Sequence, residues 1–335
     1  MFITPCKQQK QKQIFGTPLN VPASPFLKQL GYGTGVQVFR FERQPDATGS
    51  TKSPWALKCL SRRHNNDPDS KTMISSRLLE EADILRSLNH PNIVGFRGLK
   101  KLQDGRDTLI MEECSASLGD LLEERHDDKL GPLPADQMRK VCLDMCEALK
   151  YLHDTVHLLH GDIKSFNVLI KNDFEICKLC DFGVSLPLNA DGYIDLVKKP
   201  DAKYIGTGCW CAPEALIDDN VQSISSKADI FSFGLVLYEC IACVPPHTYA
   251  TDDGDTDDVE KTEDSDANES SDLEDEDGFD FEALMGTRPP LPVVESLDKE
   301  YNMLIEIFYL CTNEAPEDRP TAGCLADALK TYFSQ

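Results

Sequence analysis

The sequence predicts an α+β protein in which a small β-rich region precedes a larger helical region. Three short runs that are rich in aromatic and β-branched residues occur before residue 113: QVFRFER, PWALKCL and DTLIMEE. From Leu118 onward, helical spacing of apolar residues dominates. The length of 335 residues suits one large two-part domain. We therefore expect a domain at 26–333, with its first lobe at 26–112 and its second at 113–333.

The individual elements follow from the spacing of apolar residues. The three runs predict strands at 37–43, 54–60 and 107–113. Between the second and third, an apolar stripe at helical spacing predicts a helix: Ile74, Leu78, Ala82, Leu85 and Leu88. In the larger region, helices are expected at 134–153, 225–243, 298–311 and 321–333. No internal repeat is visible.

Two segments are expected to lie outside the packed domain. Residues 1–25 carry scattered Pro and Lys and predict a flexible tail. The net charge of −23 comes mainly from residues 251–280, which hold sixteen acidic residues and one Lys, and the rest of the chain carries only −8. A segment this charged cannot repay its ordering entropy, so a disordered acidic insertion is expected at about 250–280. A docking site for a basic partner is the alternative interpretation.

Composition also excludes several classes of function. The start of the chain is polar and basic, and no apolar run has the length of a bilayer span, so we expect no membrane association and an intracellular protein of the cytoplasm or nucleus. So acidic a chain does not suit nucleic-acid binding. The thirteen cysteines include the pairs Cys177/Cys180 and Cys240/Cys243. Buried thiols are favoured over a zinc site, because the pairs are some sixty residues apart.

A glycine-rich stretch near the start of the domain is a candidate phosphate-binding loop. Gly31, Gly33 and Gly35 stand at alternate positions between strand-like segments. Glycines in such a loop let backbone amides approach phosphate oxygens without a side chain in the way. Taken alone, however, this is a weak signal, because glycine-rich turns are common.

A lysine and a glutamate are expected to form a buried pair. Lys58 closes the strand-like stretch Trp55–Lys58, where a solvated strand end is the ordinary interpretation. Glu81, however, projects into the apolar stripe of the following helix, whereas Glu80 points to the opposite face. Burying a carboxylate without a partner is costly, and Lys58 is the obvious candidate partner.

The motif HGDIKSFN, at 160–167, carries groups suited to phosphoryl transfer. Asp162 can accept a proton from a hydroxyl, Lys164 can neutralise charge on a transferring phosphoryl group, and Asn167 can supply an oxygen to Mg²⁺. Asp181 follows in DFG, directly after a strand pattern, where it can also bind Mg²⁺. APE at 212–214, Asp229 in KADIFSFG and Arg319 in PEDRP complete the series. Together these motifs are far more specific than any one of them.

In these motifs the chain resembles the protein kinase family, and within it the MAP kinase kinase-like Ser/Thr kinases. The resemblance extends from about Pro25 to Tyr332 and includes the acidic insertion and the glycine of HGD. It implies a bilobal kinase fold, phosphorylation of Ser or Thr (alternatively also Tyr) on proteins, ATP and Mg²⁺ as cofactors, a MAP kinase as the suspected substrate and a link to mitosis. A third glycine is usual at position 36, where this chain has Val36. DFG and APE are in standard form.

Further site residues are implied by the resemblance alone. Thr207 would bond with Asp162 and Lys164, and Glu214 would pair with Arg319. Nucleotide contacts are implied for a larger set of residues: Gly31, Gly33, Gly35, Val38, Ala56, Lys58, Met111 as gatekeeper, Glu112, Cys114, Asn167 and Asp181. The last two would bind the metal, whereas Lys58, Glu81, Asp162, Lys164 and Thr207 would act in catalysis.

Gly161 replaces the arginine that usually pairs with a phosphate in the segment 181–214. We hypothesise that this segment does not depend on one phosphate for its order, and that control falls elsewhere. Thr4 in TPCK suits a proline-directed kinase, with turn chemistry as the alternative. The chain ends in TYFSQ rather than Ser/Thr-x-Val, so binding to a PDZ domain is not expected. A catalytically weak scaffold is the alternative function, favoured by Gly161 and Val36. A small-molecule phosphotransferase should lack the APE, Asp229 and Arg319 features.

Overall fold

The computed structural model describes residues 28–33, 35–43, 52–61, 68–102, 104–217, 221–248, 282–292 and 297–333. The predicted tail at 1–25 and the acidic insertion expected at about 250–280 lie outside these residues. The chain divides into two compact units, of which one comprises 1–87 and 95–113 and the other 88–94 and 114–335. The segment Leu88–Val94 thus precedes the last strands of the first unit in sequence but belongs to the second unit.

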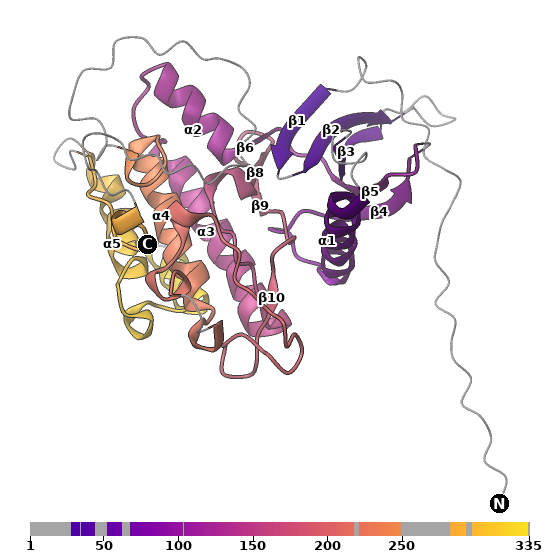
Figure 1. The fold of residues 1–335 in the computed structure, drawn as a ribbon. Helices are drawn as coiled ribbons and strands as arrows, with labels where there is room; N and C mark the ends of the chain where they lie inside the picture. The colour runs from indigo at the N-terminus through magenta and orange to yellow at the C-terminus, as the bar shows by residue number, and fades with distance from the viewer. Residues whose placement is uncertain are drawn as a thin grey trace, which may run out of the picture. The chain divides into compact units, whose positions relative to one another are not determined.

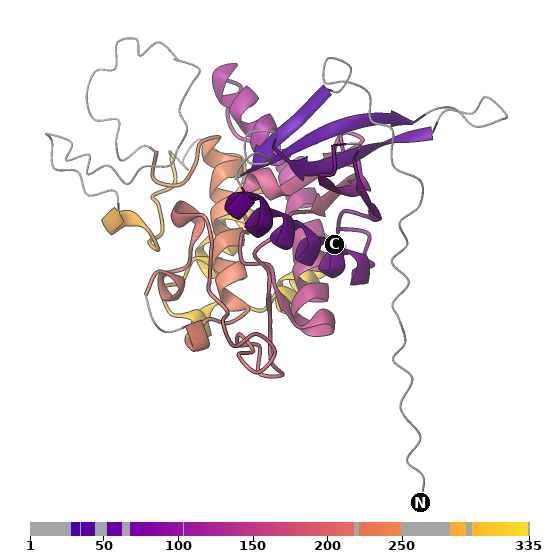
Figure 2. The same ribbon diagram turned by 45° about the vertical axis from the view of Figure 1, so that its right-hand side comes forward.

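The first unit is a five-stranded antiparallel sheet with one helix (Figure 1). Its strand order is β1-β2-β3-β5-β4. The elements are β1 (Lys28–Gly33), β2 (Val36–Arg43), β3 (Lys52–Leu60), α1 (Pro68–Ser87), β4 (Phe96–Lys101) and β5 (Asp107–Glu112). Helix α1 packs against β3, β4 and β5, as Figure 2 shows from a second side. The three predicted strands correspond to β2, β3 and β5, whereas β1 and β4 were not individually predicted.

The apolar stripe of α1 forms the contact between helix and sheet. Ile74, Leu78, Ala82 and Leu85 lie within α1 and are buried, whereas Leu88, which is also buried, follows the helix and belongs to the second unit. Glu81 lies among them and is 2% exposed, whereas Glu80 is exposed. The predicted helical face is therefore confirmed, and it delivers a carboxylate into the core.

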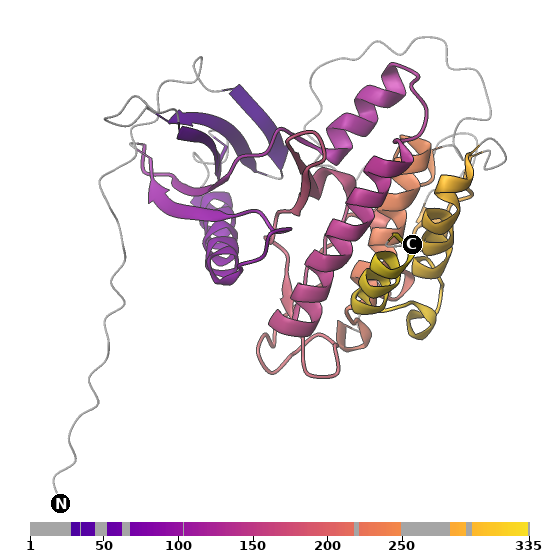
Figure 3. The ribbon, with the colours of Figure 1, turned by 180° about the vertical axis from the view of Figure 1, so that it is seen from behind.

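The second unit is mainly helical, with α3, α4 and the C-terminal helices packed side by side (Figure 3). Its helices are α2 (Leu118–Asp127), α3 (Ala135–Lys150), α4 (Lys227–Ala242), α5 (Asn302–Cys311) and α6 (Ala322–Phe333). Helix α3 continues as a π-helical turn at Tyr151–Val156, which accounts for the longer helix that the sequence predicts. Among the described residues, no helix is both long and apolar enough to cross a bilayer.

Short strands flank the loops that lie between α3 and α4 in the sequence. They form a three-stranded sheet, β6-β8-β9, and a pair, β7 with β10. Their bounds are β6 (Ala116–Ser117), β7 (Leu158–Leu159), β8 (Val168–Lys171), β9 (Ile176–Leu179) and β10 (Leu186–Pro187). β7 leads into the loop 160–167, and β9 leads into the segment 181–214. The small strands thereby fix both ends of the loop 160–167 and the start of the segment 181–214.

Helix α4 is almost wholly buried within this unit. Every residue from Ala228 to Ala242 is buried, including two carboxylates, Asp229 and Glu239. Such groups require hydrogen-bond partners, because an unpaired buried charge is strongly destabilising. The partners of both carboxylates lie in the loops described below.

Candidate active site

Lys58 and Glu81 form the expected buried ion pair within the first unit. Lys58 Nζ lies 2.9 Å from Glu81 Oε2 and 3.1 Å from Oε1, and both side chains are almost fully buried. Lys58 sits in β3, where its register partners are Val38 in β2 and Leu109 in β5. A strand in mid-sheet and the core face of α1 therefore present the two groups to each other.

The glycine-rich loop connects β1 and β2. Gly33 pairs with Val36, and Gly31 pairs with Val38. Gly35 has φ +76°, a left-handed backbone that glycine adopts without strain. A turn of two residues between paired strands calls for such a conformation. The glycine at 35, rather than a glycine at 36, therefore meets the conformational demand of this turn.

The residues predicted to contact the nucleotide base lie in β3, in the last part of β5 or just after it. Ala56 in β3 pairs with Met111 in β5, and both are buried. The Glu112 N–H donates to Gly95 O at 2.8 Å, which fixes the last residue of β5. Cys114 is buried and belongs to the second unit.

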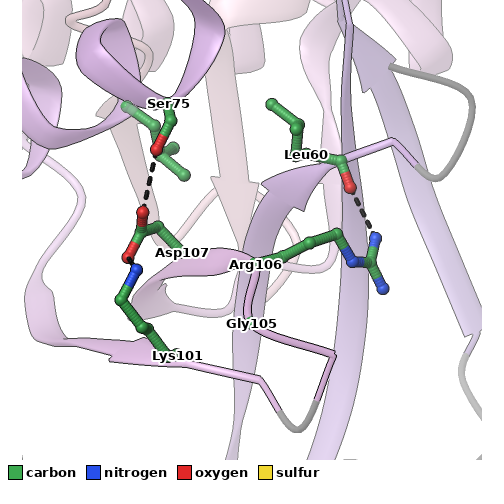
Figure 4. A pocket seen from close by; sticks show the side chains of 7 residues that line it. Leu60, Ser75, Lys101, Gly105, Arg106 and Asp107 are labelled. Carbon is green, nitrogen blue, oxygen red and sulfur yellow. Dashed lines mark hydrogen bonds and ion pairs between the residues drawn. The ribbon is translucent and has the colours of Figure 1, made fainter. Parts of the chain in front are cut away.

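The first unit also contains a small pocket of about 70 Å³. It lies between α1, the end of β3 and the β4–β5 turn, and its polar groups pair with one another (Figure 4). The Asp107 carboxylate accepts from Ser75 Oγ and pairs with Lys101 Nζ, while Arg106 Nη1 donates to Leu60 O at 2.5 Å. Its charges are already compensated, so we assign this pocket no role in the reaction.

Asp162 is the centre of a hydrogen-bonded cluster in the second unit. Its Oδ1 accepts the Thr207 hydroxyl at 2.6 Å and the Thr207 N–H at 3.2 Å. Its Oδ2 lies 2.9 Å from Lys164 Nζ and 3.0 Å from Asn167 Nδ2. Lys164 Nζ also donates to Thr207 Oγ1 at 2.7 Å. The contacts expected of Thr207 with Asp162 and Lys164 are thus present.

A backbone hydrogen bond links Asn167 to the residue before Asp181. Cys180 N–H donates to Asn167 O at 3.0 Å, which brings the residue before Asp181 against the end of the 160–167 loop. Asn167 Nδ2 donates to the Asp162 backbone oxygen at 2.7 Å. The nitrogen end of this amide therefore faces Asp162, so its oxygen is directed elsewhere. Asp181 has φ +65°, a backbone strain that is often found at functional sites.

The 160–167 loop is anchored from beneath by Asp229 of α4. Asp229 Oδ2 accepts from His160 N and contacts His153 Nε2, each at 2.8 Å, and Oδ1 accepts from Gly161 N at 2.9 Å. Burial by itself would raise the pKa of Asp229, but these bonds leave it below its ordinary value. The carboxylate thus stays ionised and holds the loop. His153 was missed by the sequence reasoning, although a polar residue in an apolar helix was a usable signal.

Gly161 occupies a position that disfavours other residues. Its φ is +81°, and a Cβ built on it would lie 3.3 Å from Val184 O. An arginine at this position would need a left-handed backbone, which costs L-residues roughly 1–2 kcal/mol. Compared with an arginine at this position, the glycine avoids backbone strain and also leaves the loop without a guanidinium group.

The segment 181–214 packs into an apolar cluster of its own unit. Residues of the segment interleave with α4 and β7, with Leu159, Phe231 and Leu235 among their neighbours. The contributing residues of the segment are Leu186, Leu188, Ile194, Ala202, Trp210 and Ala212. The only Ser and Thr of this segment are Ser185, which is buried and donates to His160 O, and Thr207. The segment thus offers no exposed Ser or Thr for phosphorylation.

Glu214 and Arg319 form the expected pair, and the arginine is fully enclosed. Arg319 Nη1 and Nη2 donate to the two oxygens of Glu214 at 2.7 and 2.9 Å. Its remaining N–H groups donate to three backbone oxygens: Asn313 O, Lys227 O and Glu314 O. The guanidinium also lies over the Phe231 ring, 4.9 Å from its centroid. This pair fixes the end of the 181–214 segment to the helical core.

Most of the twelve cysteines that the structure describes are buried. Burial raises the pKa of Cys177 to about 12, as it does for Cys211. Across the described residues, no three His, Cys, Asp or Glu side chains group closely enough to hold a metal ion.

Comparison with known proteins agrees with this geometry. The family model for the protein kinase domain matches residues 25–333, so the chain belongs to the protein kinase family. It is 45% identical over 334 residues to the human lymphokine-activated killer T-cell-originated protein kinase, covering 98% of both chains. It is 32% identical over 170 residues to the Drosophila melanogaster serine/threonine-protein kinase Tao, with 51% of this chain and 15% of that one covered. A third relative is the probable serine/threonine-protein kinase drkC of Dictyostelium discoideum, 30% identical over 233 residues, with 69% of this chain and 28% of that one covered.

The family and these relatives define the class of enzyme. The chain is a Ser/Thr protein kinase with the bilobal fold that the sequence predicted, and its reaction is ATP-dependent phosphoryl transfer to protein.

Proposed function

We propose that Asp162 is the catalytic base of this kinase and that Lys164 and Thr207 complete its reaction centre. The supporting observation is the cluster in which Asp162, Lys164 and Thr207 contact one another directly. Asp162 accepts the proton of the substrate hydroxyl, and Lys164 offsets the negative charge of the transferring phosphoryl group. Thr207 holds both side chains in place.

The same proposal assigns the nucleotide and metal contacts. Lys58, held by Glu81, binds the α- and β-phosphates, and the backbone of the β1–β2 turn covers the phosphates. Asn167 and Asp181 are oxygen donors of the kind that Mg²⁺ prefers, so the residues fit this ion. Mg²⁺–ATP supplies the phosphoryl group and neutralises part of its charge. Val38, Ala56, Met111, Glu112 and Cys114 are proposed to contact the adenine.

We further propose that the 181–214 segment reaches its catalytic arrangement without a phosphate of its own. Its apolar cluster, the Glu214–Arg319 pair and the absence of an exposed Ser or Thr support this. A MAP kinase as substrate, a role in mitosis and an upstream proline-directed kinase at Thr4 are proposals that rest on resemblance and on the TPCK motif. Thr4 lies outside the described residues.

One experiment tests the reaction centre. The purified chain is offered radiolabelled ATP with either a generic acceptor protein or a MAP kinase, and the labelled amino acids are identified. We expect label on Ser or Thr, and its loss in Asp162→Asn. Asp173→Asn, at an exposed site outside the reaction centre, is the matched control. Equal transfer by Asp162→Asn and the wild type would overturn the assignment, and no transfer by either would favour the scaffold.

A further inference from the structure

Glu239 is a buried carboxylate for which neither the kinase motifs nor the reaction centre gives a reason. It lies near the end of α4 and is 3% exposed. Three donors converge on it. Ser165 Oγ donates to Oε1 at 2.6 Å, while Ser165 N and Trp210 Nε1 donate to Oε2 at 3.3 and 2.7 Å.

These donors come from two different parts of the active site. Ser165 follows Lys164 in the 160–167 loop, and Trp210 lies three residues after Thr207 in the 181–214 segment. The two parts meet above Glu239 through Lys164 and Thr207, which are 2.7 Å apart. Glu239 therefore accepts hydrogen bonds from the same two segments that the Lys164–Thr207 contact joins at the reaction centre.

Because Ser165 and Trp210 are buried, their hydrogen bonds to Glu239 are hard to replace. The Trp210 side chain is buried, and Ser165 is 1% exposed, so water cannot take over as the acceptor for their N–H groups. A buried donor without a partner costs about 1–3 kcal/mol, and charge-assisted bonds are stronger than neutral ones. Trp210 is also held through its carbonyl, which accepts from Ser232 Oγ of α4 at 2.7 Å.

We propose that Glu239 is a positioning residue for phosphoryl transfer, fixing Ser165 and Trp210 so that Lys164 and Thr207 meet at Asp162. This rests on the proposed roles of Asp162 and Lys164. The requirement is for an acceptor at Oε2, where two N–H donors of fixed direction converge. At Oε1 the partner is a hydroxyl, which can either donate or accept.

This difference between the two oxygens yields a discriminating pair of variants. In Glu239→Gln the amide oxygen can take the place of Oε2, while its NH₂ group donates to Ser165 Oγ, so every bond is kept. Glu239→Met has similar volume but leaves Ser165 N and Trp210 Nε1 without an acceptor. The two variants therefore separate acceptor geometry from the mere presence of a side chain.

The experiment measures kcat, the KM values for ATP and protein substrate, and the melting temperature for each full-length variant. We expect Glu239→Met to lower kcat by about tenfold to a hundredfold, since small displacements of reacting groups have effects of that size. The KM for ATP should stay close to that of the wild type. Glu239→Gln should retain most of kcat, and Trp210→Phe, which removes one donor, should show a smaller loss than Glu239→Met.

Two controls keep the test specific. Thr312→Val removes a buried hydroxyl of the same unit whose partners are Phe308 O and Arg288, so it should lower the melting temperature and leave kcat unchanged. An unchanged kcat in Glu239→Met, or a loss in Glu239→Gln as large as that in Glu239→Met, would overturn the inference. Transfer that survives in Asp162→Asn would instead refute the proposed reaction centre and leave the question of Glu239 separate.

Discussion

The Thr207 hydroxyl donates a hydrogen bond of 2.6 Å to Asp162 Oδ1 and accepts one of 2.7 Å from Lys164 Nζ. One side chain thus links the proposed base to the lysine beside it. Because Thr207 belongs to the 181–214 segment, the position of that segment decides whether the two charged groups are correctly arranged.

Thr207→Val should therefore lower kcat by about tenfold to a hundredfold, because it removes the bridging hydroxyl at almost constant volume. Thr207→Ser keeps the hydroxyl and should retain most of the activity. Steady-state kinetics on both variants provide the measurement. A kcat of Thr207→Val equal to that of the wild type would contradict the role of the hydroxyl.

The Lys58–Glu81 pair allows a catalytic role to be separated from a structural one. Breaking a buried ion pair on one side costs about 3–5 kcal/mol, whereas replacing both partners with apolar residues is often neutral. Lys58→Met should therefore lower both the free energy of unfolding and kcat. The double variant Lys58→Met/Glu81→Leu should recover stability in denaturant unfolding while remaining inactive. Recovered activity in the double variant would contradict a role of Lys58 in binding phosphate.

The left-handed backbone at Gly161 predicts a cost for any side chain there. Gly161→Arg and Gly161→Ala should each lower the free energy of unfolding by about 1–2 kcal/mol, measured by urea denaturation. The arginine should not make activity depend on a phosphate in the 181–214 segment, which has no exposed Ser or Thr. Gly161→Arg as stable as the wild type would contradict the strain argument.

Arg319 is enclosed by five hydrogen bonds, of which two reach Glu214. Arg319→Met leaves the Glu214 carboxylate without its partner and should lower the free energy of unfolding by about 3–5 kcal/mol. Arg319→Lys should lower the free energy of unfolding by nearly as much, because one ammonium group cannot replace the several hydrogen bonds of the planar guanidinium. Thermal unfolding of these variants beside Lys330→Met, at an exposed ion pair, tests this. A small change in the free energy of unfolding of Arg319→Met would contradict the view that the Glu214–Arg319 pair anchors the 181–214 segment.

Glu239 predicts a pH dependence of stability. Burial raises its pKa from 4.5 to about 7, against the opposing effect of the bonds from Ser165 and Trp210 and the charge of Lys164. The other titratable groups facing it are the thiols of Cys209 and Cys240. Because the folded state holds the proton more tightly, this group's contribution to stability is present below pH 4.5 and is lost as the pH rises to 7.

The contribution amounts to about 3 kcal/mol over that range, at 1.4 kcal/mol per pKa unit. Glu239→Gln cannot titrate, so its stability relative to the wild type should rise by about this amount as the pH increases from 4.5 to 7.5. Urea denaturation of both proteins at several pH values gives the difference. A difference that does not change with pH would show that the Glu239 pKa is not raised.

The local patterns in the sequence predicted the parts of the site that depend on periodicity and spacing. The helical stripe singled out Glu81 over Glu80, since burial without a partner would be costly, and Lys58 indeed pairs with it. The HGDIKSFN spacing placed Asp162, Lys164 and Asn167 on one loop, where they contact one another.

Contacts between distant segments were not predictable in this way. Nothing near Ser165 or Trp210 in sequence points to Glu239, because that contact depends on how α4 packs beneath two separate loops. Similarly, Leu88–Val94 was expected in the first lobe, yet Asn92 Nδ2 donates to Cys177 O and Val94 N to Leu179 O in the second unit. The signal that was available for Glu239 is a carboxylate within an otherwise apolar helix.

The most direct test of this account is phosphoryl transfer by protein that has been treated with phosphatase and shown by mass spectrometry to carry no phosphate on residues 181–214. We predict that such protein transfers label from ATP to Ser or Thr at the rate of untreated protein, and that Asp162→Asn does not. Loss of transfer after phosphatase treatment would contradict a 181–214 segment that is ordered without phosphate. No transfer by either preparation would contradict catalysis itself.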